Sequence, residues 1–275
     1  MARSFGYLSR ETPIHRLNGV SKLLMVLLIS ISVMISYDTR FLTAIVILSI
    51  IMFGVAKIKF VEIKFLFYFI AVFMLINAIV IFLFSPNQGT AVYGTHHLLF
   101  HIAGPYSMTS EQLFYMANVI LKYFTVLPLA LIFILTTEPS EFASSLNRIG
   151  VSYKIAYSVS LTLRYIPDIQ RDFRNISQAQ QARGIDISKK AKLTTRLKNV
   201  TSILMPLVFT SLERIDVITN AMELRGFGRS RKRTWYRSRR LGRLDVLLIL
   251  LCLVFLAISV SLIFVNHGRF YNPFK

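Results

Sequence analysis

The chain has 275 residues, of which 54% are hydrophobic and only 16% charged, and its net charge is +19. A soluble domain averages about 25% charged residues. Here the apolar residues come in blocks with the charges between them, which argues against a soluble protein and favours a membrane protein. The single cysteine, Cys252, excludes a disulfide within the chain and a cysteine-based metal site, and its apolar setting predicts a buried or lipid-facing side chain.

The excess of 32 Lys and Arg over 13 Asp and Glu allows three interpretations. It could bind nucleic acid, lie against anionic lipid, or mark the cytoplasmic loops of a membrane protein. The apolar blocks favour the last two.

Five apolar segments predict membrane-spanning helices in an all-α fold. A span needs about 20 mostly apolar residues, with a range of about 17–25. The segments that meet or approach this length are 20–36, 41–56, 65–84, 114–136 and 244–265. The first segment leads directly into the next apolar block without small residues for a processing site, so we interpret it as a retained span.

The positions of Lys and Arg predict the orientation, because cytoplasmic loops carry the excess of these residues. They occur before the first span and after the second, are absent from 85–113, and number 21 against 8 Asp and Glu in 137–243. This alternation predicts a multi-pass protein with a cytoplasmic N-terminus and an external C-terminal tail. The expected domains are a four-span membrane domain (1–136), a cytoplasmic region (137–243), and a last span with its tail (244–275).

Few polar residues lie within the predicted spans. Lys122 is expected to reach the outer interface, and Asn77 to face other helices. No series of Asp, Glu or His crosses the membrane, which argues against a proton-driven transporter. In the 85–113 loop, His97 and His101 are spaced as on one helix face, but a metal site needs more ligands than this pair, and no nearby Asp, Glu or Cys completes one.

The 137–243 region contains two stretches built on one plan. Each begins apolar, contains a proline (Pro167 or Pro206), continues as an amphipathic stretch and ends in an Arg-Gly pair. The two arginines, Arg183 and Arg225, are 42 residues apart. Each stretch predicts a long helix in which the proline permits a kink and the glycine ends the helix.

The Arg-Gly ends allow two interpretations. Each can simply be a good C-cap, with a cation near the helix dipole and a glycine in the left-handed conformation. Two matched ends in one region also suit docking into grooves of a partner, where a guanidinium can hold a carboxylate with two bonds. The residues that form the two ends are Ala182, Arg183, Gly184, Leu224, Arg225 and Gly226.

A basic stretch precedes the last span. Residues 229–243 contain eight Lys and Arg and no acid, which favours an anchor on anionic lipid over nucleic-acid binding. Trp235 and Tyr236 fit an interfacial location. The residues that we assign to the membrane surface are Arg229, Arg231, Lys232, Arg233, Arg237, Arg239 and Arg240.

The chain resembles the transmembrane T component of energy-coupling-factor (ECF) importers of vitamins and metal ions, the EcfT/CbiQ family. The similarity covers most of the chain, about residues 5–265. It departs from the family pattern at Asn18–Lys22, where Asp-Pro-x-x-Lys is usual, at Leu224, where Ala is usual, and in a richer basic stretch. The segments that carry it are 13–17, 22–23, Leu163–Pro167, Ala179–Gly184, 206–207 and Ala221–Gly228.

The resemblance implies a non-catalytic subunit of an ATP-driven importer in the bacterial cell membrane. In the family, two coupling helices dock their arginine-bearing tips into two cytoplasmic ABC-type ATPase subunits, and a separate substrate-binding membrane protein, the S component, rests on these helices. By position, Arg183 and Arg225 would be the docking residues. ATP and Mg²⁺ would bind the ATPases, and this chain, which has no phosphate-cradling Gly-x-x-x-x-Gly-Lys-Ser/Thr loop, would bind no cofactor.

Three other functions make different predictions. A secondary transporter should have inverted repeats and charged residues at the membrane midplane, and neither is evident. An intramembrane enzyme should have a motif such as His-Glu-x-x-His or paired aspartates within the spans, and the sequence has none. A function as a lipid-binding membrane anchor is supported by the basic stretch alone.

Overall fold

The computed structural model describes residues 10, 12–103, 106–185, 193–230, 234–235 and 239–274. They form two compact units: residues 7–137 with 240–275, here called the membrane unit, and residues 138–239, called the crossed-helix unit. The elements, in chain order, are α1 (Pro13–Arg16), α2 (Gly19–Ile35), α3 (Thr39–Ala56), α4 (Phe60–Phe84), α5 (Gln88–Tyr93), β1 (Leu98–Ala103), β2 (Tyr106–Thr109), α6 (Ser110–Thr136), α7 (Pro139–Arg148), α8 (Tyr153–Ala182), α9 (Leu193–Leu224) and α10 (Arg243–Val265).

The membrane unit confirms the predicted all-α, polytopic membrane class. Four helices in the described part of the chain are long and apolar enough to span a bilayer: α3, α4 from Ile63, α6 and α10. The first predicted span forms α2, which has only 17 residues, or about 26 Å at 1.5 Å per residue. Asn18 caps its start and the chain turns at Ser36, so α2 is at the lower limit of length for a span.

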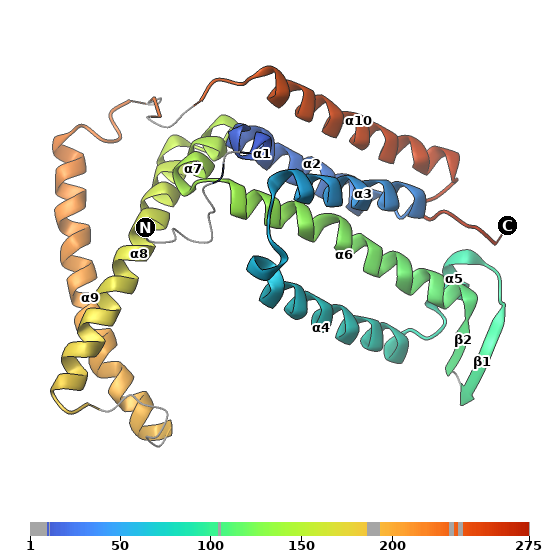
Figure 1. Ribbon diagram of the computed structural model, residues 1–275, viewed down its shortest axis with the longest axis horizontal. Coiled ribbons are helices and arrows are strands. Elements are labelled where there is room, and N and C mark those ends of the chain that lie inside the picture. The colour runs from blue at the N-terminus through green and yellow to red at the C-terminus, as the bar shows by residue number, and fades with distance from the viewer. Residues whose placement is uncertain are drawn as a thin grey trace. The chain divides into compact units, whose positions relative to one another are not determined.

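The core of the membrane unit is built around α2. This helix packs against α10 and α6, and α3 packs against α6, as the nearly parallel ribbons of Figure 1 show. Cys252 is buried in this core, as predicted. The other buried apolar residues at its centre are Met25, Ile29, Val33, Phe41, Leu42, Ile45, Leu129 and Ile132.

Two buried charged residues hold the helix ends of the membrane unit. Lys22 Nζ donates a hydrogen bond to the carbonyl of Thr136, the last residue of α6, at 2.8 Å. Asp245, at the start of α10, accepts hydrogen bonds from the Asn18 amide, the Ser21 hydroxyl and the Gly242 amide, each at 2.8 Å. The start of α2 is thereby fixed to the end of α6 and to the start of α10.

At the opposite end of the unit, the tail after α10 returns to the turn between α2 and α3. The Tyr37 amide donates to the Arg269 carbonyl at 2.8 Å, and Asn266 Nδ2 donates to Asp38 Oδ2 at 2.7 Å. Lys122, which we expected to reach the interface, places its ammonium 3.7 Å from the centre of the Tyr37 ring. Its cation therefore contacts an aromatic face at this end of the unit.

The 85–113 segment differs from the predicted loop. It contains α5 and an antiparallel hairpin, β1–β2. His97 precedes β1 and His101 lies in it, so the two do not share a helix face. One acidic side chain does lie close to a histidine: Glu111, fully buried at the start of α6, lies 2.6 Å from His97 Nδ1. No group of three metal-binding side chains occurs among the described residues.

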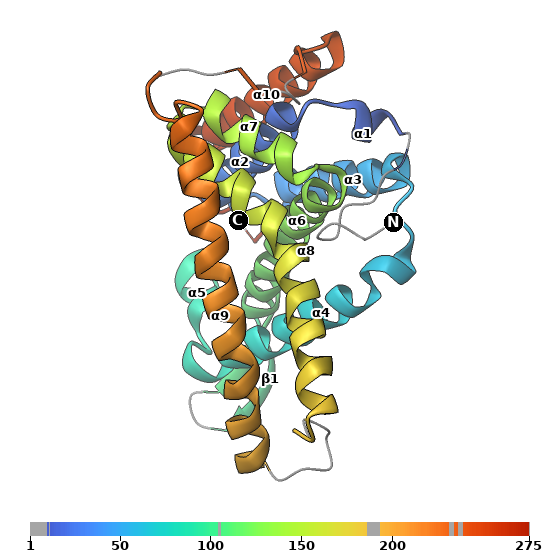
Figure 2. The same cartoon turned by 90° about the vertical axis from the view of Figure 1, so that its left-hand side faces the viewer.

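The crossed-helix unit contains α7 and two long helices, α8 with 30 residues and α9 with 32. These are the two helices predicted from the repeated plan, and each continues through its proline, Pro167 or Pro206. They run antiparallel and cross (Figure 1), and Figure 2 shows them side by side from a second direction.

Candidate partner-docking site

The two Arg-Gly ends adopt the same backbone turn. At the end of α8, the Gly184 amide bonds the Gln181 carbonyl and the Ile185 amide bonds the Gln180 carbonyl. At the end of α9, the Gly226 amide bonds the Glu223 carbonyl and the Phe227 amide bonds the Met222 carbonyl. This is the Schellman pattern, in which the glycine takes a positive φ, here +86° for Gly184 and +67° for Gly226.

The turn alone does not identify a docking site. The same pair of hydrogen bonds ends α7 at Gly150 and α10 at His267, neither of which was expected to bind a partner. The tips of α8 and α9 differ from these in placing an exposed arginine at the cap position, Arg183 or Arg225.

Apolar exposure adds to the argument at the second tip. Leu224 is 90% exposed, more than any other large apolar side chain described. Ala182 and Gly184 are exposed at the first tip, and Gly226 is half-buried at the second. Each tip thus presents a guanidinium beside small or apolar surface, a combination suited to a groove with an acidic wall.

Gln180 connects the first tip to the proline of α9. Pro206 has no amide hydrogen, so the carbonyl four residues before it, that of Ser202, lacks its helical donor. The Gln180 side chain of α8 donates to this carbonyl at 3.2 Å. Because the Gln180 carbonyl also accepts the Ile185 amide in the turn of the first tip, one residue joins that tip to α9 one turn before its proline.

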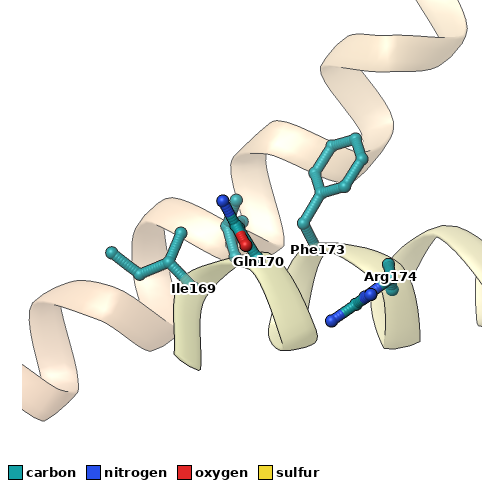
Figure 3. Close-up of a pocket in the computed structure, with 5 residues that line it drawn as sticks. Ile169, Gln170, Phe173 and Arg174 are labelled. Atoms are coloured by element: carbon teal, nitrogen blue, oxygen red, sulfur yellow. The ribbon is translucent and has the colours of Figure 1, made fainter. Parts of the chain in front are cut away.

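An ion pair and apolar packing complete the crossing of α8 and α9. Arg214 Nη2 lies 2.6 Å from Asp172 Oδ2, with both side chains about one-third exposed. Figure 3 shows Phe173 directed toward α9 and Arg174 directed away from it. Both residues line a pocket at the crossing, to which α9 contributes Leu207. The crossing therefore combines one charged contact with apolar contacts.

Beyond the crossing, the two helices border an apolar groove. It has a volume of about 340 Å³ and includes Ile215, Ile218 and Met222, which form the apolar stripe of α9. Tyr165, Ile166 and Ile169 of α8 line the other side, and Arg214 of α9 is also among the lining residues. Such a groove can receive apolar side chains of another protein.

An aromatic cluster supports the second tip. Phe227 directly follows the tip. Its ring centre lies 4.8 Å from the ring centre of Tyr157 and 5.4 Å from that of Tyr153. Trp235 is 6.2 Å from Tyr153 and donates its indole N–H to Asn147 Oδ1 of α7 at 3.1 Å. The half-buried indole thus packs within the crossed-helix unit, and its location at the membrane interface stays a prediction. The sequence shows no local signal for this packing, since the partners lie far away in the chain.

Part of the basic stretch is described. Arg229, Arg239 and Arg240 are exposed. The other residues assigned to the membrane surface, Arg231, Lys232, Arg233 and Arg237, lie outside the described residues, as does Tyr236.

Comparison with known proteins identifies the family. The sequence profile of CbiQ, described as cobalt transport protein, matches residues 10–236, which include α1 to α9 and both arginine tips. The chain belongs to the EcfT/CbiQ family. This membership confirms the resemblance found in the sequence and makes the chain a transmembrane component of a transporter.

Curated relatives from several bacteria cover nearly the whole chain. The energy-coupling factor transporter transmembrane protein EcfT of Streptococcus equi subsp. equi (strain 4047) is 29% identical, over 90% of this chain and 91% of the relative. EcfT of Bacillus selenitireducens (strain ATCC 700615 / DSM 15326 / MLS10) is 28% identical, over 91% and 93%.

A relative of another kind is much longer than this EcfT/CbiQ chain. The putative ABC transporter ATP-binding protein BL0043 of Bifidobacterium longum (strain NCC 2705) is 27% identical over 191 residues, which are 66% of this chain but only 23% of that protein. A segment similar to this chain therefore occurs within a protein named for ATP binding.

Proposed function

We propose that this chain is the coupling subunit of an ECF-type importer and that it transmits conformational change from two ABC-type ATPase subunits to a separate substrate-binding membrane protein. The observation that carries the proposal is the pair of matched tips, each with an exposed arginine at the cap position. Two equivalent tips suit two equivalent ATPase subunits, one for each tip.

The crossing explains how motion at one tip would reach the other helix. Gln180 and the Asp172–Arg214 pair tie α8 to α9. A displacement of either tip therefore acts on both helices, and through them on whatever occupies the apolar groove. In this proposal the groove holds the S component, since its apolar residues suit a membrane-protein surface.

The relatives support the ATPase as partner. Several are named as transmembrane proteins of energy-coupling factor transporters, and BL0043 carries its similar segment within a protein named for ATP binding. By the same proposal, this chain hydrolyses no ATP itself and has a cytoplasmic N-terminus in the bacterial plasma membrane. The exposed arginines before α10 would contact anionic lipid.

Co-purification tests the proposal directly. The affinity-tagged chain, extracted from its native membrane in mild detergent, should retain ABC-type ATPase subunits and a second small membrane protein, both identifiable by mass spectrometry. The purified complex should hydrolyse ATP, and the chain stripped of the other subunits should not. Recovery of the chain without any ATPase, from cells that express one, would reject the proposal.

A further inference from the structure

The β1–β2 hairpin has an inverted distribution of polar and apolar side chains. On β1, Leu98 and Leu99 are about half exposed and Phe100 is 72% exposed. On β2, Ser107 and Thr109 are buried. The exposed side chains of β1 are thus apolar while small polar side chains of β2 are buried, and contact with water alone does not favour exposing three large apolar side chains in a row.

The hairpin contacts the end of α4, a helix whose apolar surface is largely exposed. The Tyr106 hydroxyl donates to the Leu83 carbonyl at 3.4 Å, and its ring lies 6.1 Å from that of Phe82. Only 6% of the apolar part of α4 is buried within the chain, against 22% for α6. Phe84, the last residue of α4, is 82% exposed. The apolar side chains of β1 therefore extend the exposed apolar surface of a helix that is long and apolar enough to span a bilayer.

The orientation of the strands fits the surface of a membrane better than its interior. Figure 1 shows β1 and β2 running across the direction of α4 and α6, at the end of these helices. A two-stranded sheet leaves backbone groups on its outer edges unpaired. These groups are too costly to place in the hydrocarbon core, but they find partners among water and lipid headgroups at the interface.

The charged residues of this segment are compatible with a location at the membrane surface. Residues 85–113 contain no Lys or Arg. Their one acidic residue, Glu111, is fully buried and takes hydrogen bonds from the His97 amide at 3.0 Å and 3.1 Å. The sequence of the hairpin, residues 98–109, thus contains no Lys, Arg, Asp or Glu that would hold it in bulk water.

We propose that the β1–β2 hairpin is a membrane-surface anchor, which inserts Leu98, Leu99 and Phe100 into the headgroup region of the leaflet at the end of α4. The ligand is the lipid surface itself. Interfacial elements of this kind bury their apolar side about 5–10 Å into the headgroup and acyl boundary. This function is independent of any coupling between ATPases and transport.

Spin labelling of the full chain in lipid vesicles tests the anchor. In a Cys252→Ala background, which removes the chain's single natural cysteine, a nitroxide is attached to cysteine at Phe100, and separately at Leu98 in case the first variant folds poorly. Gln88→Cys, exposed and polar in the same segment, is the aqueous control. Leu75→Cys, exposed near the middle of α4, is the deep control. Collision rates with oxygen and with a water-soluble nickel chelate report depth.

The anchor predicts that labels at Phe100 and Leu98 have an oxygen-to-nickel accessibility ratio between those of the two controls. A ratio equal to that at Gln88 would mean that the hairpin lies in water and would overturn the proposal. Low accessibility to both reagents would mean that protein, such as a second copy of the chain, covers the hairpin, and this result would overturn it as well.

Discussion

Lys22 shows how a charged side chain is used inside the membrane unit. It is 1% exposed, and its ammonium caps the C-terminus of α6, where carbonyls have no helical donor and the helix dipole is negative. From the sequence, Lys22 was noted as part of the segments that resemble the EcfT/CbiQ family. Its partner, Thr136, is 114 residues away, so no local pattern could predict the contact.

Replacing Lys22 with Met should destabilise the membrane unit. Met keeps most of the volume but leaves the Thr136 carbonyl without this donor, and a hydrogen bond to a charged group contributes about 1.5–3 kcal/mol. The measurement is thermal unfolding in detergent. Lys64→Met, at an exposed lysine of the same unit, is the control. Equal stability of the two variants would show that the Lys22 contact contributes nothing.

The arginine tips were predictable as helix ends for a physical reason. A helix stop of the Schellman type depends on a glycine at one position and needs no distant partner, so local sequence is sufficient to place Gly184 and Gly226. Asp245 could not be recognised in the same way, because its donors Asn18 and Ser21 lie more than 200 residues earlier.

At the scale of elements, apolar blocks predicted the long helices but not their partners or the hairpin. The sequence contains a hairpin signal, since turn formers Gly104-Pro105 separate two runs of strand-forming residues. The spacing of His97 and His101 suggested a helix face instead. The helix α2 has the 17 residues predicted for the first span, shifted by one position, because the Asn18 cap and the turn at Ser36 set its ends.

The ion pair between α8 and α9 should stabilise their crossing. Since both side chains are only about one-third exposed, we expect Asp172→Arg or Arg214→Asp to cost about 1 kcal/mol, at the upper end for a partly solvated pair. The double exchange should recover most of this loss. The control is the exposed pair Asp168 and Arg171, at 4.0 Å within one helix, where exchange should cost less than about 0.5 kcal/mol.

Thermal unfolding of the four proteins of each cycle measures these values. If the stability lost in the double exchange of Asp172 and Arg214 equals the sum of the losses in the two single variants, the pair does not hold the crossing.

The aromatic cluster should act on the second tip and not on the first. Under the proposed function, Trp235→Ala removes the bond to Asn147 and the contact with Tyr153, and should weaken ATPase binding through Arg225. Trp235→Ala should therefore be non-additive with Arg225→Ala and additive with Arg183→Ala. ATPase binding by the single and double variants measures this, with Trp235→Phe as a control that keeps a ring. Equal coupling to both arginines would contradict the account.

At the scale of the whole molecule, the boundaries between the two units fall at 137/138 and 239/240. The expected domain limits were 136/137 and 243/244. Whether the units act as separate domains stays a prediction. So does the orientation, which rests on the distribution of Lys and Arg.

Cysteine labelling in intact cells tests the orientation. In a Cys252→Ala background, a cysteine at Gln88 should react with a membrane-impermeant maleimide added outside, and a cysteine at Asn220 should react only after the cells are opened. Both positions are exposed in the structure, so accessibility within the protein does not decide the result. The reverse pattern would place the N-terminus outside.

The central claim is that Arg183 and Arg225 dock into ATPase subunits. If each guanidinium meets a partly buried carboxylate, its removal should cost about 2–5 kcal/mol of binding, because the carboxylate is left unpaired. Arg→Lys should restore only part of this, since an ammonium cannot make the bidentate contact. A simple C-cap predicts a loss of about 0.3–1 kcal/mol of helix stability, with Lys as good as Arg.

The most direct measurement is ATPase capture, followed by uptake in cells, for Arg183→Ala, Arg225→Ala, the double Ala variant and the double Lys variant, with Arg174→Ala as the exposed control on α8. The account predicts that each single change weakens capture, that the double Ala change nearly abolishes capture and uptake, that the Lys variant is intermediate, and that the control is normal. A double Ala variant that captures ATPases and transports like the unchanged protein would contradict it.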